Sequence, residues 1–354
     1  MRIINDKKEA FKELKRIATR TNSETNHKIN AIVEEILQEV NTYGDIAVEK
    51  YTRKFDGFNP NPMQVGAETI KNAWDEIDSN LKRSLEVAHQ RIKKFHEKEI
   101  PISFTLKGEH GDLVQRRWRP VKKAGIYIPG GRASYPSTVL MNAIPATVAG
   151  VEEIIMVSPG NAEGEINKTV LAAAYLCGIN KVFRIGGAQA IGALAFGTNQ
   201  IDKVDVISGP GNIYVTTAKK LIYGSTGIDS LAGPSEILII ADESARSKHI
   251  ASDLLAQAEH DPLASSILLT TSKNQAKEVL EELYKKIDDH PRKEICMQSI
   301  KNWGLIVICE NYESCIELSN NFAPEHLEIL ALDSKKILED IENAGAIFLG
   351  KWTP

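Results

Sequence analysis

The chain has 354 residues, of which 42% are hydrophobic and 25% charged, and its formal net charge at pH 7 is −4. These values are those of an ordinary multidomain globular protein, and they leave no basic excess for binding a nucleic acid backbone. The N-terminus has no apolar segment of signal-peptide length, and nowhere do 18 apolar residues run together. The sequence therefore predicts a cytoplasmic protein without nucleic acid or membrane as a partner.

The first hundred residues show the spacing of amphipathic helices. Apolar residues fall on one face in two stripes: Ile29, Ile32, Val33, Ile36, Leu37 and Val40, then Leu81, Leu85, Ala88, Ile92 and Phe95. Gly44 predicts the end of the first helix. We expect residues 1–120 to form a helical region that packs on an α/β core.

From about Ala124 onward, short β-branched runs alternate with helical patterns. The runs are AGIYI, EIIMVS, KVFRI, VDVIS, EILIIA, SILLTT, LIVIC and HLEILAL. Apolar strands separated by helices are typical of parallel sheets covered on both faces. The predicted fold class is α/β, with two Rossmann-like parallel-sheet units over residues 121–233 and 234–354.

Four loops rich in glycine or proline adjoin these strands: YIPGGRAS, RIGGAQAIG, SGPGN and AGPSE. Ligands of such sheets bind at the carboxyl ends of the strands, and three of the loops open helices whose N–H groups suit a pyrophosphate or carboxylate. No GxGxxG or GxxxxGK[ST] fingerprint is present. Tyr127, Gln189 and Asn212 are the side chains best placed to add specificity. Any one loop taken alone is better explained as a tight turn, but several together favour a ligand.

Two further stretches carry candidate chemistry. Gln257 and His260 lie three residues apart near a helix end, so they could hold one zinc or manganese ion, or simply form a polar helix end. Glu325 and His326 follow a proline turn at the entrance of an apolar strand, where adjacent side chains point to opposite faces. This pair could divide general-base and water-activating roles, or could be two surface residues.

The four cysteines form no CxxC pair, and Cys177 and Cys309 sit inside apolar runs. We expect free, reduced thiols. An aldehyde dehydrogenase that works through a covalent cysteine stays open as an alternative, and alkylation of Cys177 or Cys309 would abolish such an activity.

Taken together, the motifs resemble the histidinol dehydrogenase family. The stretches that carry the resemblance are GIYIPGG, STVLMNAIPA, IGGAQAIGALAFGT, ISGPGNIYVTTAKK, AGPSEILIIAD, ASDLLAQAEHDP and FAPEHLEI, in this order. The resemblance spans most of the chain. It implies a zinc-dependent homodimer that oxidises L-histidinol to L-histidine through a retained aldehyde, in two NAD-dependent hydride transfers.

The resemblance also implies roles for individual residues. Tyr127, Gln189 and Asn212 match the positions that contact NAD in the family. Ser235, Gln257, His260 and His326 match substrate positions, and Gln257 and His260 match zinc ligands as well. Glu325 and His326 match the catalytic pair, with His326 as the acid-base group and Glu325 as the residue that activates water.

The chain departs from the family at its C-terminus. Family members continue for several dozen residues beyond the position of Pro354, with an aspartate and a histidine that complete the zinc site and a segment exchanged with the partner subunit. We therefore expect the small C-terminal domains of the family to be missing, and this form to hold zinc poorly and turn over little. The alternative is a non-catalytic remnant that binds NAD or dimerises.

Overall fold

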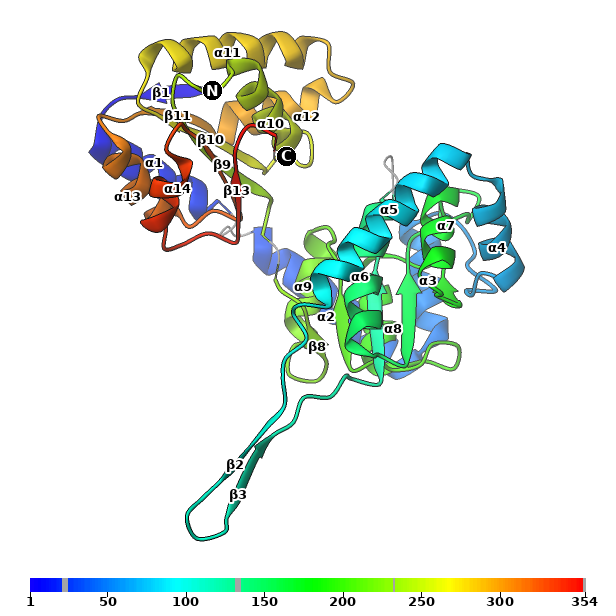
Figure 1. The fold of residues 1–354 in the computed structure, drawn as a ribbon. Coiled ribbons are helices and arrows are strands. Elements are labelled where there is room, and N and C mark those ends of the chain that lie inside the picture. The colour runs from blue at the N-terminus through cyan, green and yellow to red at the C-terminus, as the bar shows by residue number, and fades with distance from the viewer. Residues whose placement is uncertain (21–24, 131–134, 232, 353–354) are drawn as a thin grey trace. The chain divides into compact units, whose positions relative to one another are not determined.

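The structure, a computed structural model, describes residues 1–20, 25–130, 135–231 and 233–352 (Figure 1). Two compact units make up the chain. The N-terminal α/β unit comprises residues 25–232, and the C-terminal α/β unit combines residues 1–24 with residues 233–354. The first 24 residues thus differ from the prediction for residues 1–120, because strand β1 (Arg2–Ile4) pairs in parallel with β11 (Gly304–Ile308) of the C-terminal unit.

The N-terminal unit is built on a five-stranded parallel sheet with the order β6-β5-β4-β7-β8. Its strands are β4 (Lys123–Tyr127), β5 (Glu153–Val157), β6 (Lys181–Phe183), β7 (Val206–Ser208) and β8 (Gly227–Ile228). Numbered along the chain, these strands lie in the order 3-2-1-4-5. The order reverses between β4 and β7, which is where a doubly wound sheet binds its ligand.

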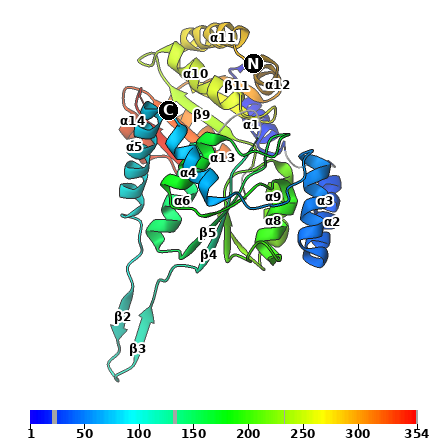
Figure 2. The same cartoon turned by 90° about the vertical axis from the view of Figure 1, so that its right-hand side faces the viewer.

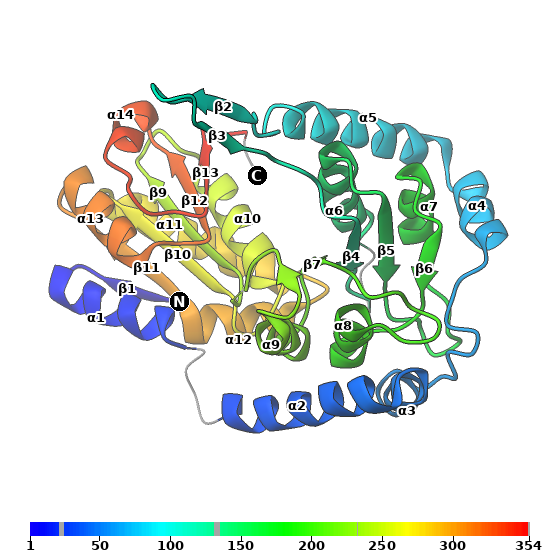
Figure 3. The ribbon, with the colours of Figure 1, turned by 90° about the horizontal axis from the view of Figure 1, so that it is seen from below.

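Helices cover both faces of this sheet (Figure 3). One face packs against α2 (Thr25–Tyr43), α3 (Asp45–Phe55), α8 (Gly187–Phe196) and α9 (Ile213–Ile222). The other packs against α4 (Ala67–Glu76), α5 (Ser79–His96), α6 (Pro136–Ala149) and α7 (Lys168–Leu176). Neighbouring strand residues alternate between the two cores, as Ile126 and Tyr127 do in β4. Burial on both faces explains why the strands read as continuous apolar runs.

The predicted helical stripes are largely buried, but Ile32 and Phe95 are exposed. The region predicted as helical also contains an antiparallel hairpin, β2 (Phe104–Lys107) and β3 (Leu113–Arg116), which projects from the N-terminal unit (Figure 2). The helical periodicity ends at Phe95, so nothing in the apolar spacing supports a helix over these strands. All eight hairpin strand residues are exposed.

Five strands of the C-terminal unit, β9 to β13, repeat the same order, and β1 is added at one edge. Its six-stranded parallel sheet runs β1-β11-β10-β9-β12-β13, with β9 (Glu236–Ala241), β10 (Ser265–Thr270), β12 (His326–Leu330) and β13 (Ala346–Leu349). One face packs against α1 (Lys7–Ala18), α13 (Tyr312–Phe322) and α14 (Ser334–Glu339). The other packs against α10 (Ser247–Ala258), α11 (Lys273–Asp288) and α12 (Lys293–Trp303). The two sheets confirm the predicted α/β class.

In the part of the chain that the structure describes, no helix combines the length and the apolar character needed to cross a bilayer.

Candidate active site

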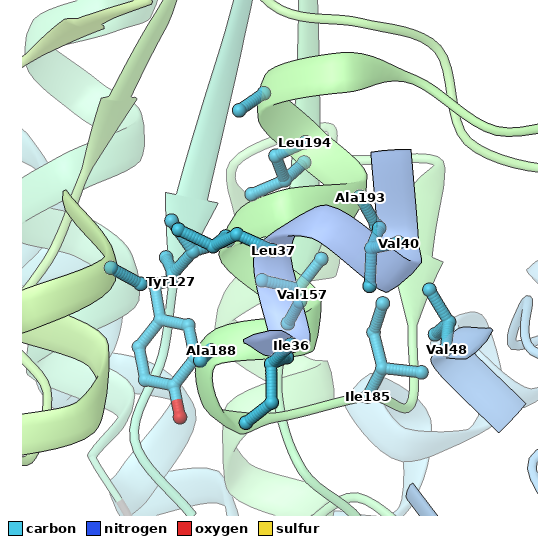
Figure 4. Close-up of a cluster of buried hydrophobic side chains, with 14 of the residues drawn as sticks. Ile36, Leu37, Val40, Val48, Tyr127, Val157, Ile185, Ala188, Ala193 and Leu194 are labelled. Carbon is cyan, nitrogen blue, oxygen red and sulfur yellow. The ribbon is translucent and has the colours of Figure 1, made fainter. Parts of the chain in front are cut away.

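Tyr127 closes strand β4 at the carboxyl edge of the N-terminal sheet. Its side chain is 4% exposed, and its hydroxyl oxygen accepts a hydrogen bond of 3.2 Å from the backbone N–H of Gly187, the first residue of α8. In Figure 4 the ring lies at the side of the apolar cluster, with its oxygen turned away from the aliphatic side chains. Burial raises the pKa of Tyr127 to about 12, so its hydroxyl keeps a proton that it can donate.

Gln189 lies in the first turn of α8 and is 1% exposed. Neither its amide nitrogen nor its amide oxygen has a hydrogen-bond partner among the described residues. An amide buried without partners costs folding free energy of about 1–3 kcal/mol. A ligand that supplied both a donor and an acceptor would remove that cost.

The SGPGN loop follows β7, and its first glycine is required by the backbone. Gly209 has a φ of +115°, and a Cβ at this position would overlap the carbonyl oxygen of Tyr127. Lys219 stabilises the loop. Its side chain is 4% exposed, donates to the carbonyl of Gly209 over 3.0 Å and pairs with Asp229. Asp229 also accepts from the N–H of Gly209 over 2.8 Å. The first glycine therefore serves a close approach to β4.

Asn212 is the N-cap of α9. Its side-chain oxygen accepts from the backbone N–H groups of Tyr214 and Val215 over 3.1 and 3.2 Å. The residue is exposed, and its amide NH₂ is the part that remains available to donate. The helix begins at Ile213, and the cap already occupies the N–H groups of Tyr214 and Val215.

A cavity of about 1000 Å³ opens at the same edge of the N-terminal sheet. Its walls include Pro129 and Gly130 after β4, Ser158 and Pro159 after β5, and Arg184 after β6. The carboxyl ends of three neighbouring strands thus surround a space of the size that small-molecule ligands occupy. Residues 131–134 of the YIPGGRAS loop lie outside the described residues.

In the C-terminal unit, Ser235 and Glu236 lie at the start of β9. Buried Arg20 anchors this segment: it donates to the carbonyl of Pro234 over 2.9 Å and to the Glu236 carboxylate over 2.8 Å. The side chain of Arg20 is 1% exposed, and it also donates to the carbonyl of Leu263 over 2.7 Å, in the loop before β10. One guanidinium therefore ties the entrances of two neighbouring strands together. Ala232 of AGPSE lies outside the described residues.

Glu325 and His326 both turn toward the backbone of Glu236. The Glu325 carboxylate accepts from the Glu236 N–H over 3.2 Å, and Nδ1 of His326 lies 3.2 Å from the Glu236 carbonyl oxygen. A carbonyl oxygen only accepts, so Nδ1 carries the proton and Nε2 keeps its lone pair. The two side chains are 3.8 Å apart, which corrects the expectation that they point to opposite faces. The reason is that Glu325 precedes the strand, which begins at His326.

Gln257 lies in the last turn of α10, and His260 follows two residues after the helix ends. The backbone N–H of His260 donates to the carbonyl of Gln257 over 3.2 Å. Gln257 is 9% exposed and His260 is exposed. Within the described ranges, no group of three or more His, Cys, Asp or Glu side chains is arranged to hold a metal ion.

The candidate residues at the strand entrances of the C-terminal unit lie at the amino edge of its sheet. Sheet register places Glu236 beside Ser265 and His326 beside Ile237, at the first residues of β9, β10 and β12. In this unit the candidate residues thus precede their strands, as the positions of AGPSE and FAPEHLEI in the sequence predict.

The carboxyl edge of the C-terminal sheet is occupied by its own side chains. Asp242, which follows β9, accepts from the hydroxyl of Tyr312 over 2.6 Å and from the N–H of Leu332 over 2.9 Å. Burial tends to raise the pKa of Asp242, but the hydrogen bonds from Ser244, Tyr312 and Leu332 lower it below its ordinary value. This edge is thus satisfied internally.

The cysteines Cys177, Cys296, Cys309 and Cys315 are free, as predicted. Burial raises the pKa of Cys177 to about 12, which suits a core thiol and not a nucleophile.

Sequence reasoning missed Arg20, Lys219 and Asp229. Arg20 and Glu236 are 216 residues apart, so no local pattern reveals their contact. Lys219 and Asp229 both follow the SGPGN loop in the same unit, and the one local signal for them is a single Lys on the apolar stripe of α9.

Two Rossmann-like sheets, an unsatisfied amide at the edge of one and a carboxylate–imidazole pair at the edge of the other define an enzyme of the α/β class. A sequence profile described as histidinol dehydrogenase matches residues 19–354. The chain belongs to the histidinol dehydrogenase family, whose members are oxidoreductases.

Individual relatives agree with this assignment. The chain is 89% identical to a histidinol dehydrogenase of Prochlorococcus marinus (strain MIT 9312), over 100% of its own length and 80% of that protein. It is 77% identical to the histidinol dehydrogenase of strain CCMP1986 of the pastoris subspecies, covering 83% of that protein. Its structure is similar to a crystal structure of histidinol dehydrogenase from Elizabethkingia anophelis, with a TM-score of 0.87 and 37% identity over 91% of this chain and 75% of that one.

Proposed function

We propose that this enzyme oxidises L-histidinol to L-histidine through L-histidinaldehyde, with two NAD⁺ as hydride acceptors and zinc to orient the substrate. Membership of the histidinol dehydrogenase family supports the reaction. The observation that carries the site is the pair formed by Glu325 and His326 on the backbone of Glu236. Among the described residues, Nε2 of His326 and the second carboxylate oxygen of Glu325 have no hydrogen-bond partner.

The residues present fit NAD. The unsatisfied amide of Gln189, the hydroxyl proton of Tyr127 and the amide NH₂ of Asn212 all belong to the carboxyl edge of the N-terminal sheet. They offer donors and one acceptor to a polar ligand. When bound there, NAD⁺ would supply the hydride acceptor.

Zinc fits in part. The amide oxygen of Gln257 and the imidazole of His260 are zinc-compatible donors, and they are two of the four ligands that a structural or substrate-orienting site usually has. When bound there, zinc would orient the imidazole and amine of the substrate. We keep as a prediction that residues 1–354 alone hold zinc weakly and turn over slowly.

His326 moves the proton in the first oxidation. Its Nε2 takes the hydroxyl proton of histidinol as the carbinol carbon loses a hydride, which converts the alcohol to the aldehyde. The Glu236 carbonyl keeps the imidazole in the required tautomer and orientation.

Glu325 acts before the second oxidation. One of its oxygens accepts from the Glu236 N–H, so the other can take a proton from water as that water adds to the aldehyde. His326 must first release its earlier proton to solvent. The hydrate anion formed at the aldehyde would then give up its hydride, with bound NAD⁺ as the acceptor, and its hydroxyl proton would pass to Nε2 of His326, which leaves the carboxylate of histidine.

Two further properties accompany the proposal. We infer a homodimer, as the family implies, and light scattering measures it. We also infer a cytoplasmic location, since four free thiols suit a reducing compartment.

The test is the ratio of NADH formed to histidinol consumed, with zinc present. It is run on the 354-residue chain and on this chain extended by the C-terminal segment of the 89% identical relative. We expect two NADH and one histidine per histidinol, and for Glu325→Gln one NADH with accumulation of the aldehyde. If neither form oxidises histidinol while both bind NAD⁺, the non-catalytic alternative is correct. An unchanged ratio of two in Glu325→Gln would contradict the role of Glu325.

A further inference from the structure

Asp56 carries an unexplained buried oxygen near the candidate cofactor residues. It is the C-cap residue of α3, and its Oδ2 is buried without a hydrogen-bond partner among the described residues. Its backbone N–H donates to the carbonyl of Thr52 over 2.8 Å, so the main chain is satisfied and the carboxyl alone is not. A carboxyl group left in this state destabilises the fold, and an unused buried acceptor is a frequent sign of a ligand.

The packing of α3 places Asp56 on the side of the start of α8. Gly44, just before α3, neighbours Thr198 after the end of α8, so Asp56 at the other end of α3 lies toward Gly187, and Tyr51 of α3 shares a buried cluster with Tyr127. The carboxylate contributes to the raised pKa of Tyr127, and no hydrogen bond joins the two side chains in the described structure. Tyr127 in turn accepts from the N–H of Gly187, two residues before Gln189. The phenolic proton of Tyr127 and the unsatisfied amide of Gln189 thus lie at the start of α8, and the carboxyl of Asp56 lies at the end of α3 that is turned toward it.

We propose that Asp56 is a fourth cofactor-binding residue, whose carboxylate accepts a hydrogen bond from a neutral donor of NAD⁺, a ribose hydroxyl or the carboxamide NH₂. This inference rests on the proposed use of NAD. An anionic acceptor binds such donors more strongly than a neutral one, and hydroxyls of ribose are common partners of acidic residues in doubly wound folds.

The surroundings of Asp56 allow its ionisation to be followed in the pH dependence of NAD⁺ binding. Burial raises its pKa to about 6. Helix α8, which packs against α3, has no titratable side chain, while Glu35 and Glu39 of α2 face Tyr51 and Lys50. Tyr127 is the titratable group that faces Asp56 from β4. The affinity for NAD⁺ should therefore rise as the pH increases through about 6.

The experiment measures the Kd of NAD⁺ between pH 5 and pH 8, together with thermal stability, for wild type and Asp56→Asn. We expect the variant to bind NAD⁺ about tenfold more weakly at pH 8, to lose the pH dependence, and to unfold at the same or a higher temperature. The unfolding temperature should not fall, because asparagine removes an unsatisfied buried charge. A purely structural role of Asp56 would instead predict a lower unfolding temperature in the variant.

Asp45 supplies the matched control. It begins the same helix, and its Oδ1 is also buried without a partner in the described structure. It lies at the other end of α3, beside Gly44, which neighbours Thr198 after α8. Asp45→Asn should leave the Kd unchanged.

Three outcomes overturn the inference. Equal affinity and an equal pH profile in Asp56→Asn would remove Asp56 from the site and leave the proposed function intact. Absence of NAD⁺ binding by wild type would overturn the proposed function and this inference together. If Asp56→Asn does not fold, a pH-independent wild-type Kd is sufficient to reject the role.

Discussion

The two units of the chain share one strand order but differ in the sheet edge that carries the candidate residues. In the N-terminal unit Tyr127 and Asn212 lie at the ends of strands, at the carboxyl edge. In the C-terminal unit Glu236 and His326 open strands, at the amino edge. A repeated topology therefore does not fix which edge carries the candidate residues.

Hydrogen bonding explains the difference. At the carboxyl edge of the C-terminal sheet, Asp242 binds Tyr312, Leu332 and Ser244, so polar groups there have partners within the protein. At the corresponding edge of the N-terminal sheet, Gln189 is buried with both amide atoms unsatisfied among the described residues. The edge left unsatisfied by the fold is the one that can accept a ligand.

Removal of the proposed acid-base group gives the largest expected effect. His326→Asn keeps a side chain of similar size without a basic nitrogen, so histidinol oxidation should fall by about 10³. The Kd of NAD⁺ should stay within twofold, because the proposed cofactor residues belong to the other unit. Steady-state kinetics and a binding titration measure the two quantities, and a parallel loss of NAD⁺ affinity would break the proposed separation.

Arg20→Met tests the anchor of the amino edge. The variant leaves the Glu236 carboxylate and three backbone carbonyls without their donor, which should lower the free energy of unfolding by about 3 kcal/mol. Turnover should decrease with it, whereas NAD⁺ affinity should not. Lys219→Met removes the corresponding buried cation of the N-terminal unit. This variant should lower the affinity for NAD⁺ and leave turnover unchanged. Urea unfolding measures the free energy of unfolding of both variants, and titration measures their affinity for NAD⁺.

The smallest effect is a change in the pH dependence of stability. Glu328, on β12, is 1% exposed, and burial, followed by the nearby Asp253, raises its pKa to about 9. The unfolded chain releases this proton from about pH 4.5 upward, so the contribution of Glu328 to stability is present at low pH and is lost as the pH rises toward 9.

Glu328→Gln should therefore flatten the fall in unfolding free energy between pH 5 and pH 8, by up to about 1.4 kcal/mol per pH unit. Exposed Glu317, which pairs with Lys7, provides the control, since Glu317→Gln should leave the slope unchanged. Equal slopes in wild type and Glu328→Gln would show that this carboxyl is ionised in the folded protein.

Local sequence patterns predict the strands and lead to three of the proposed cofactor residues. Apolar runs indicate the strands because both faces of each sheet are buried, and glycine turns lead to Tyr127, Gln189 and Asn212. The remainder depends on contacts between distant residues. Arg20 meets Glu236 across 216 positions, and Asp56 comes near Tyr127 only after α3 packs beside the sheet. The opposite edges of the two units likewise depend on sheet register, which no single stretch encodes.

The N-terminal unit is proposed to bind NAD⁺ and the C-terminal unit to bind histidinol. Hydrogen–deuterium exchange of the chain, with NAD⁺ alone and then with L-histidinol and zinc, tests this division most directly. We expect NAD⁺ to slow exchange in the segments around Gly187 and Gly209, and histidinol with zinc to slow it around Glu236 and His326. Protection of the Glu236 segment by NAD⁺ alone, with none around Gly187, would contradict the assignment of the cofactor to the N-terminal unit.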